Sequence, residues 1–185
     1  MKNNFRYDLV KNYLKKVKIK KKIKDYFGGK NILVTGGAGA IGSNLVIALS
    51  QLVGEKGMVI VLDNLTSIKG KHPIDLPSLQ NIMFVKGDIR NDTDLKRVFR
   101  EKPTIVYHMA AFFANQNSVD YPENSAEVDV NGLIKLLDLS QFTNVERFIY
   151  ASSGCSIYGS YGKMPLKEDF MSMHLTTPYQ INKMV

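Results

Sequence analysis

The chain has 185 residues, of which 44% are apolar, and it carries a formal net charge of +8. That length and composition suit one domain with a hydrophobic core. A single cysteine excludes an internal disulfide and fits a reducing compartment, so we expect a cytoplasmic protein. The sequence has no apolar run of about 18 residues that would cross a membrane. Its basic N-terminus lacks the apolar region of a secretory signal.

The net positive charge resides in the first 30 residues. They contain eleven Lys and Arg residues against Asp8 and Asp25, a net charge of +9, whereas residues 31–185 contain 14 basic and 15 acidic residues. The basicity belongs to an arm and not to a globular surface, which argues against a nucleic-acid-binding domain. We expect a basic arm over residues 1–30 and one domain over residues 31–185.

The arm also carries apolar residues at helical spacing. They fall near one helical face, with lysines around them: Phe5, Leu9, Tyr13, Leu14 and Val17. One interpretation is an amphipathic helix that rests on the domain or, through residues 1–28, on anionic lipid as a peripheral membrane contact. The other, which we favour, is a solvated extension that frays into Lys18–Lys24.

A glycine turn follows the first apolar run of the domain. Ile32–Val34 predicts a short buried strand, and Gly36, Gly39 and Gly42 then precede the helical periodicity of Ile41–Val53. Glycines let backbone N–H groups approach a pyrophosphate, and the dipole of a helix favours its charge. In this context we favour a dinucleotide site over a purely structural turn.

The second strand ends in a carboxylate. Met58–Asp63 is an apolar run, and Asp63 lies 27 residues after Gly36. An acidic residue at this strand tip can accept both ribose hydroxyls of adenosine and would repel a 2′-phosphate, which favours NAD over NADP. Lys69 and Lys71 weaken that preference, and a solvated loop aspartate is the alternative.

Residues 64–80 contain glycine and prolines and predict a loop. A third strand over Ile82–Val85 leads to Asp88 and Ile89. These two residues either flank an adenine ring, one by a hydrogen bond and one by packing, or form a plain turn.

The remaining segments continue an alternation of strands and helices. They are a helix capped by Asp92 or Thr93 and ending at Arg100, a strand over Thr104–Met109, a helix over Ser125–Gln141 and a strand over Arg147–Ala151. Core-facing positions on the two helices are Leu95, Val98 and Phe99, then Val128, Leu133, Leu136 and Leu137. The pattern predicts an α/β fold with a Rossmann-like, doubly wound parallel sheet that binds ligands at the carboxyl ends of its strands.

Small residues follow the fourth strand. Ala110 and Ala111 would let the backbone come close to a cofactor. His108, just before them, is interpreted as a satisfied strand-end histidine. No second histidine or carboxylate stands at metal-ligand spacing, so no metal site is predicted.

Near the C-terminus a tyrosine and a lysine share one helical face. Thr176 or Thr177 can cap a helix with Pro178 in its first turn, which places Tyr179 and Lys183 four residues apart. A phenol titrates near ~10, but a neighbouring ammonium and a cationic nicotinamide would favour the phenolate. Tyr179 could then take a hydroxyl proton while hydride leaves for the nicotinamide.

Ser153, at the end of the fifth strand, could hydrogen-bond the same substrate oxygen. The predicted catalytic residues are therefore Ser153, Tyr179 and Lys183.

The order of these motifs resembles that of the extended short-chain dehydrogenase/reductases, and most closely the nucleotide-sugar epimerases of the UDP-glucose 4-epimerase type. The resemblance covers residues 31–185 and rests on Thr35–Ser43, Asp63–Leu65, Gly87–Arg90, His108–Ala111, Ser152–Gly159 and Tyr179–Lys183. It implies a nucleotide-sugar substrate, a homodimer, the catalytic triad named above and a bound NAD that is reduced and reoxidised. The cofactor-binding residues expected are Gly36, Gly39, Ala40, Ile41, Gly42, Asp63, Asn64, Asp88, Ile89, Ala110 and Ala111, with Tyr179 and Lys183.

Four positions depart from the patterns of relatives. Gly154 stands where many have Ser or Thr, and Val128 stands where an Asn is often found. Cys155 and Ser156 replace the acid pair with which related dehydratases eliminate water, which favours epimerisation.

The chain ends at Val185, where family members continue, so we expect an incomplete fold that lacks the substrate lobe. The alternatives are a non-catalytic dinucleotide-binding fragment and a dehydratase or reductase of the same family.

Overall fold

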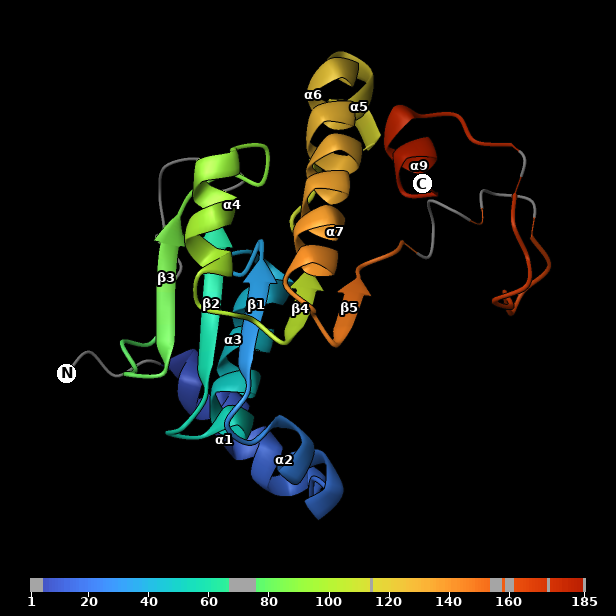
Figure 1. Cartoon of the computed structure of the whole chain (residues 1–185). Helices are drawn as coiled ribbons and strands as arrows, with labels where there is room; N and C mark the ends of the chain where they lie inside the picture. The colour runs from blue at the N-terminus through green and yellow to red at the C-terminus, as the bar shows by residue number, and fades with distance from the viewer. Residues whose placement is uncertain are drawn as a thin grey trace.

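The computed structural model describes residues 5–66, 76–113, 115–153, 158, 162–172 and 174–184. At its centre lies a five-stranded parallel sheet with the strand order β3-β2-β1-β4-β5 (Figure 1). The strands are β1 (Asn31–Thr35), β2 (Met58–Asp63), β3 (Ile82–Lys86), β4 (Ile105–His108) and β5 (Arg147–Tyr150). The predicted strands and the doubly wound α/β fold are confirmed.

Helices cover both faces of the sheet. Alternating side chains divide between two clusters: Ile32 and Val34 pack toward α3 (Ala40–Val53), whereas Leu33 packs toward α4 (Asp92–Phe99) and its neighbour α7 (Gly132–Phe142). These strand residues are fully buried. Continuous apolar runs form the central strands because neither face of a parallel sheet meets water.

The helix expected over Ser125–Gln141 is part of a longer helical segment. It begins as α6 (Pro122–Ala126), passes through a π-helical turn η1 (Glu127–Asn131) and continues as α7. A π-turn inserts extra backbone into a helix, which shifts the face that later residues present. Leu133 and Leu136 are buried as predicted, but the prediction for Leu137 was wrong, since it is 44% exposed.

Two further details differ from the predictions. The cap of α4 is Asn91, whose side chain accepts hydrogen bonds from the Thr93 and Asp94 N–H groups, and not Asp92 or Thr93. A short helix α5 (Asn115–Asp120) was not predicted because its sequence is polar and carries no apolar periodicity.

The basic arm forms α1 (Phe5–Val17) and α2 (Lys21–Phe27), and both pack against α3. The prediction that the arm frays into Lys18–Lys24 was therefore wrong, because α2 begins at Lys21. Its last residue, Phe27, packs against the cluster that contains Ile32, Val34 and the buried face of α3.

The packed face of α1 also differs from the predicted one. Tyr7, Val10 and Leu14 are half-buried, whereas Phe5, Leu9, Tyr13 and Val17 are exposed. Of the predicted apolar stripe, Leu14 alone is half-buried, so α1 rests on the domain through a face at the edge of that stripe. Among the described residues, no helix has both the length and the apolar character needed to cross a membrane.

The last described helix is α9 (Pro178–Asn182), next to the C-terminus in Figure 1. Thr177 is its cap: the Thr177 hydroxyl accepts from the Gln180 N–H, and the Gln180 side chain accepts from the Thr177 N–H at 3.2 Å. Such a capping box satisfies two N–H groups that a helix start leaves unpaired. Of the two predicted caps, the structure selects Thr177, with Pro178 in the first turn as expected.

Candidate active site

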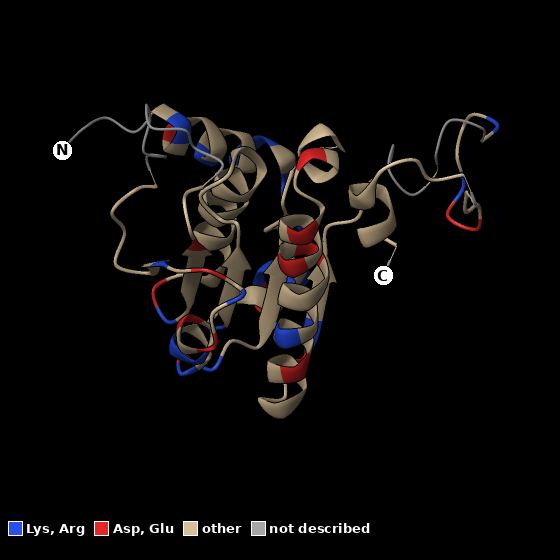
Figure 2. Cartoon of the chain, turned by 90° about the horizontal axis from the view of Figure 1, so that it is seen from above, with Lys and Arg blue, Asp and Glu red and all other residues tan. Residues whose placement is uncertain are grey.

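A cleft of roughly 780 Å³ opens at the carboxyl ends of the strands, the edge that Figure 2 views from above. Its volume lies in the range of ligand-binding clefts. Every residue predicted for cofactor binding or catalysis lines it: Gly36, Gly39, Ala40, Ile41, Gly42, Asp63, Asn64, Asp88, Ile89, Ala110, Ala111, Ser153, Tyr179 and Lys183. The structure therefore brings residues from both ends of the sequence to one edge of the sheet.

The glycine turn is shaped by two close backbone approaches. Gly36 has a φ of +66°, and a Cβ there would lie 2.6 Å from the Ala110 nitrogen. A Cβ on Gly42 would collide with the Gly36 carbonyl oxygen. Glycine at both positions lets the turn join β1 to α3 while it lies against the end of β4.

The start of α3 can accept an anion. Gly39 precedes the helix and supplies no side-chain cap, and the first turn contains no acidic residue. The first N–H groups of a helix have no partner within the helix, and its dipole favours negative charge there. These features fit a pyrophosphate group.

Asp63 is held rigidly at the tip of β2. Its carboxylate accepts the Ala38 N–H at 2.9 Å and the Leu65 N–H at 2.8 Å, and the residue is only 8% exposed. A carboxylate has more than two acceptor positions, so ribose hydroxyls could still bind. Lys69 and Lys71, which were weighed against NAD, lie outside the described residues.

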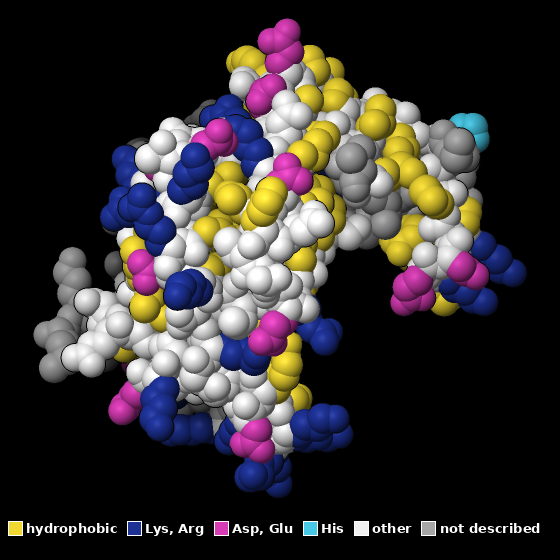
Figure 3. Space-filling model, viewed as in Figure 1, with side chains coloured by type: hydrophobic (Ala, Val, Ile, Leu, Met, Phe, Trp, Pro, Cys, Tyr) yellow, Lys and Arg dark blue, Asp and Glu magenta, His cyan; other side chains and the backbone are white. Residues whose placement is uncertain are grey.

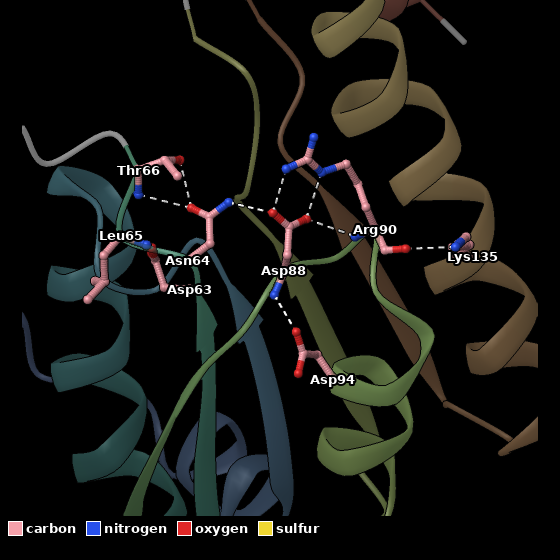
Figure 4. A network of polar contacts seen from close by, with 8 residues as sticks. All are labelled: Asp63, Asn64, Leu65, Thr66, Asp88, Arg90, Asp94 and Lys135. Carbon is pink, nitrogen blue, oxygen red and sulfur yellow. Dashed lines mark hydrogen bonds and ion pairs between the residues drawn. The ribbon is translucent and has the colours of Figure 1, made fainter.

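Asp88 belongs to a polar network beside Asp63 (Figure 4). The Arg90 guanidinium donates two hydrogen bonds to the Asp88 carboxylate, at 3.0 and 2.8 Å, and the Asn64 amide donates a third at 2.8 Å. The hydrogen bonds from Arg90 lower the pKa of Asp88 to about 2. Asp88 thus forms a turn and also lines the cleft, while Ile89 is buried among core residues.

His108 is the last residue of β4 and is almost completely buried. Its Nδ1 lies 2.7 Å from the Thr35 hydroxyl, and its ring stacks on Tyr150 at 5.5 Å. Burial lowers the pKa of His108 to about 3. We predicted that the ring nitrogens of His108 have hydrogen-bond partners. This is correct for Nδ1, whereas Nε2 has no partner among the described residues. In the described part of the chain, no three His, Cys, Asp or Glu side chains could hold a metal ion.

Tyr179 and Lys183 enter the cleft from α9 and the residue after it. The Lys183 ammonium lies 5.8 Å from the centre of the Tyr179 ring and 4.6 Å from that of Tyr150, and it donates to the Ala151 carbonyl at 3.2 Å. Burial lowers the pKa of Lys183, and the charge of Asp129 opposes that shift. A cation near a phenol favours the phenolate, so this arrangement can supply a base.

Sequence reasoning missed the side chains that hold α9 in place. Asp129, in the π-helical turn, accepts the Phe112 N–H at 2.8 Å and the Ser125 hydroxyl at 3.1 Å. Ser125 in turn accepts from the Asn182 amide at 3.0 Å. A second contact joins the Tyr179 N–H to the hydroxyl of Ser118 in α5, also at 3.0 Å. The sequence signal that could have indicated this role is an aspartate between Val128 and Val130, because a carboxylate that becomes buried requires partners.

Arg6 is another residue of the cleft that the sequence did not indicate. It comes from α1, and no spacing rule connects an N-terminal arm with a glycine turn. Ser153 lines the cleft as predicted, whereas Gly154, Cys155 and Ser156, on which the choice of reaction partly rested, lie outside the described residues.

This fold and cleft agree with a match to the NAD dependent epimerase/dehydratase family over residues 32–185. The chain belongs to that family.

Three relatives show the similarity. The UDP-glucose 4-epimerase of Mycolicibacterium smegmatis is 36% identical over 152 residues, which cover 82% of this chain and 47% of the relative. An epimerase from Methanothermobacter thermautotrophicus superposes with a TM-score of 0.80 and 48% identity, covering 89% of this chain and 48% of that one. The UDP-glucose 4-epimerase of Thermus thermophilus in complex with NAD superposes with a TM-score of 0.69 and 34% identity. The match covers 83% of this chain and 47% of that one. The chain thus spans about half the length of these relatives.

Proposed function

We propose that the protein takes part in NAD-dependent epimerisation of a nucleotide sugar through a transient keto intermediate. The observation that carries this proposal is that the glycine turn, Asp63 and the Tyr179–Lys183 pair all line one cleft. A dinucleotide site and a base for a sugar hydroxyl would therefore lie side by side. The epimerase family membership supports the same reaction class.

The cleft fits the cofactor by its backbone and by its charge. The start of α3 would hold the pyrophosphate, Asp63 the adenosine ribose, and Asp88 and Ile89 the adenine side of the cleft. Ala110 and Ala111 would leave room beside β4. When bound, NAD supplies a hydride acceptor and donor next to the sugar carbon.

The protein's own groups would handle the proton. Tyr179 would accept the proton of the sugar hydroxyl, and Ser153 would hydrogen-bond the same oxygen. The Lys183 ammonium is buried, and electrostatic interactions are stronger where water is excluded, so it would stabilise the Tyr179 phenolate. After the keto sugar rotates, Tyr179 would return the proton to the product.

Substitution of Tyr179 tests this proposal. Tyr179→Phe should lower the interconversion of UDP-glucose and UDP-galactose by about 10²–10⁴-fold, as expected for loss of a general base, with little change in NAD affinity. Tyr121→Phe is the matched control, because Tyr121 is 59% exposed and does not line the cleft. Turnover by Tyr179→Phe at the rate of the unsubstituted protein would refute the role of Tyr179.

The same assay separates the alternatives. NAD binding without turnover of any UDP-hexose by the unsubstituted protein would indicate a dinucleotide-binding module. Accumulation of NADH in step with product would indicate a reductase or dehydrogenase instead of an epimerase.

A further inference from the structure

The basic arm reaches the cleft through one side chain. Arg6, in the first turn of α1, lines the cleft together with the glycine turn, and its guanidinium donates to the Ser43 hydroxyl. Ser43 lies in the first turn of α3 and is fully buried, so it fixes the guanidinium beside the start of that helix. The hydrogen bond between the Gln51 amide and the Tyr7 hydroxyl, at 3.1 Å, adds a second contact between the two helices.

Arg6 is exposed at the rim of the cleft, and its charge has no acidic partner in the described part of the chain. None of the ion pairs among the described residues includes Arg6, and the first turn of α3 holds no acidic residue. The dipole of α3 puts positive partial charge at the same end, where a cation is unfavourable. Two positive groups held side by side at the edge of a cleft form a site for an anion that lies between them.

We propose that Arg6 binds the pyrophosphate of the dinucleotide, so that the arm is part of the cofactor site. This inference rests on the proposed function, because it takes the anion to be that of NAD. A guanidinium carries five N–H donors in a planar fork. One nitrogen contacts Ser43, and the remaining donors can reach phosphate oxygens in the bidentate manner that guanidinium favours.

The packing of α1 gives the arm a mechanical role in this binding. Val10 and Leu14 are half-buried against α3 and line a groove with Asn44 and Ala48 of that helix. Figure 1 shows α1 lying behind the sheet on the side of α3. A ligand that joins Arg6 to the start of α3 therefore adds a further contact between α1 and α3, and it holds the arm more firmly on the domain.

Binding of three probes to Arg6→Gln tests the inference. ADP-ribose contains the pyrophosphate without nicotinamide, and adenosine contains neither. Arg6→Gln should weaken binding of NAD and ADP-ribose by about tenfold or more, the effect of losing a hydrogen bond to a charged group, and leave adenosine binding unchanged. Lys15→Gln makes the same charge change on an exposed position of α1 that does not line the cleft, and it should bind all three probes normally. Dissociation constants come from isothermal titration calorimetry.

Hydrogen exchange gives a second readout that needs no substitution. Saturating ADP-ribose should slow amide exchange over residues 5–17 of the unsubstituted protein, whereas adenosine should not. Equal binding of NAD by Arg6→Gln and the unsubstituted protein would overturn the role of Arg6 while leaving the proposed function intact. Equal weakening of all three probes, adenosine included, would also overturn it. If the unsubstituted protein bound no NAD, the proposed function and this inference would both fall.

Discussion

The two ends of the cleft are built differently. At the end that contains the glycine turn, which we propose as the cofactor end, β1 and β2 are almost completely buried, and the backbone of the turn packs directly against the backbone that follows β4. At the other end, which contains Tyr179 and Lys183 and which we propose as the catalytic end, Phe148, Ile149 and Tyr150 of β5 are only half-buried. Figure 3 shows hydrophobic side chains gathered at the surface on the side of the molecule where α7 and the segment before α9 lie, and the exposed residues of these segments include Ile134 and Met171.

This difference indicates what stabilises each end. The cofactor end depends on apolar burial and on the absence of Cβ atoms, which are properties of one continuous stretch of sequence. The catalytic end depends on buried polar side chains that join α9 to α5, α6 and η1. Three predictions separate these two kinds of dependence.

The largest effect is expected at the glycine turn. Gly36→Ala adds a Cβ 2.6 Å from the nitrogen of Ala110, two residues after β4, at a φ of +66°, and should lower the free energy of unfolding by about 3–5 kcal/mol and abolish NAD binding. Gly54→Ala is a close control, because Gly54 has a φ of +67° but an added Cβ would meet no atom within 4 Å. Its ψ of −163° places Gly54 in a backbone region that is nearly restricted to glycine, so the substitution should cost only that backbone strain, about 1–3 kcal/mol. Urea denaturation measures both, and equal losses would show that the approach of Gly36 to Ala110 is not a constraint.

A smaller effect is expected in the network that holds α9. Asp129→Ala leaves the Phe112 N–H and the O–H of Ser125 without an acceptor and should lower the free energy of unfolding by about 2–3 kcal/mol, since each buried unsatisfied group costs about 1–3 kcal/mol. Burial raises the pKa of Asp129, so removal of a disfavoured charge offsets part of that loss. Asp138→Ala, at an exposed position of α7, should change stability by less than ~0.5 kcal/mol.

Hydrogen exchange adds the local test of this prediction. In Asp129→Ala, exchange should increase at residues 178–182 more than at β1. A uniform increase would mean that the network supports the whole domain and not the catalytic end in particular.

The smallest effect is the change in stability with pH that we expect from the titration of His108. Its pKa falls from 6.5 in the unfolded chain to about 3 in the folded protein, so the unfolded chain binds more protons between these values. The free energy of unfolding should therefore decrease on acidification, by about 2 kcal/mol between pH 7 and pH 5. Asp88 titrates below this range in both states, and the raised pKa of Asp129 acts in the opposite direction.

Two histidine variants isolate the contribution of His108. His108→Gln should lose most of the decrease in stability between pH 7 and pH 5, whereas His174→Gln, which replaces an exposed histidine, should retain it. If both variants kept the full decrease, His108 would not be the group that titrates.

The sequence predicted the cofactor end better than the catalytic end. The strands, α3 and the positions of Gly36 and Asp63 follow from periodicity and spacing within about 30 residues, so local rules suffice. The π-helical turn and the face of α1 that packs were not predicted, because both depend on contacts with distant segments. Tyr179 and Lys183 were identified as a pair, but their spacing alone gave no reason why α9 should stay beside β5.

The sequence by itself determined the alternation of strands and helices, the glycine turn and the chemical types at each strand end. These are encoded by neighbouring residues, whose backbone preferences and apolar spacing act locally. Only the tertiary structure decided that Asp129 is joined through Ser125 to Asn182 of α9. It alone also decided that Arg6 of the arm lies beside the start of α3. Both placements arise because burial forces polar groups to find partners wherever the folded chain presents them, regardless of their separation in sequence.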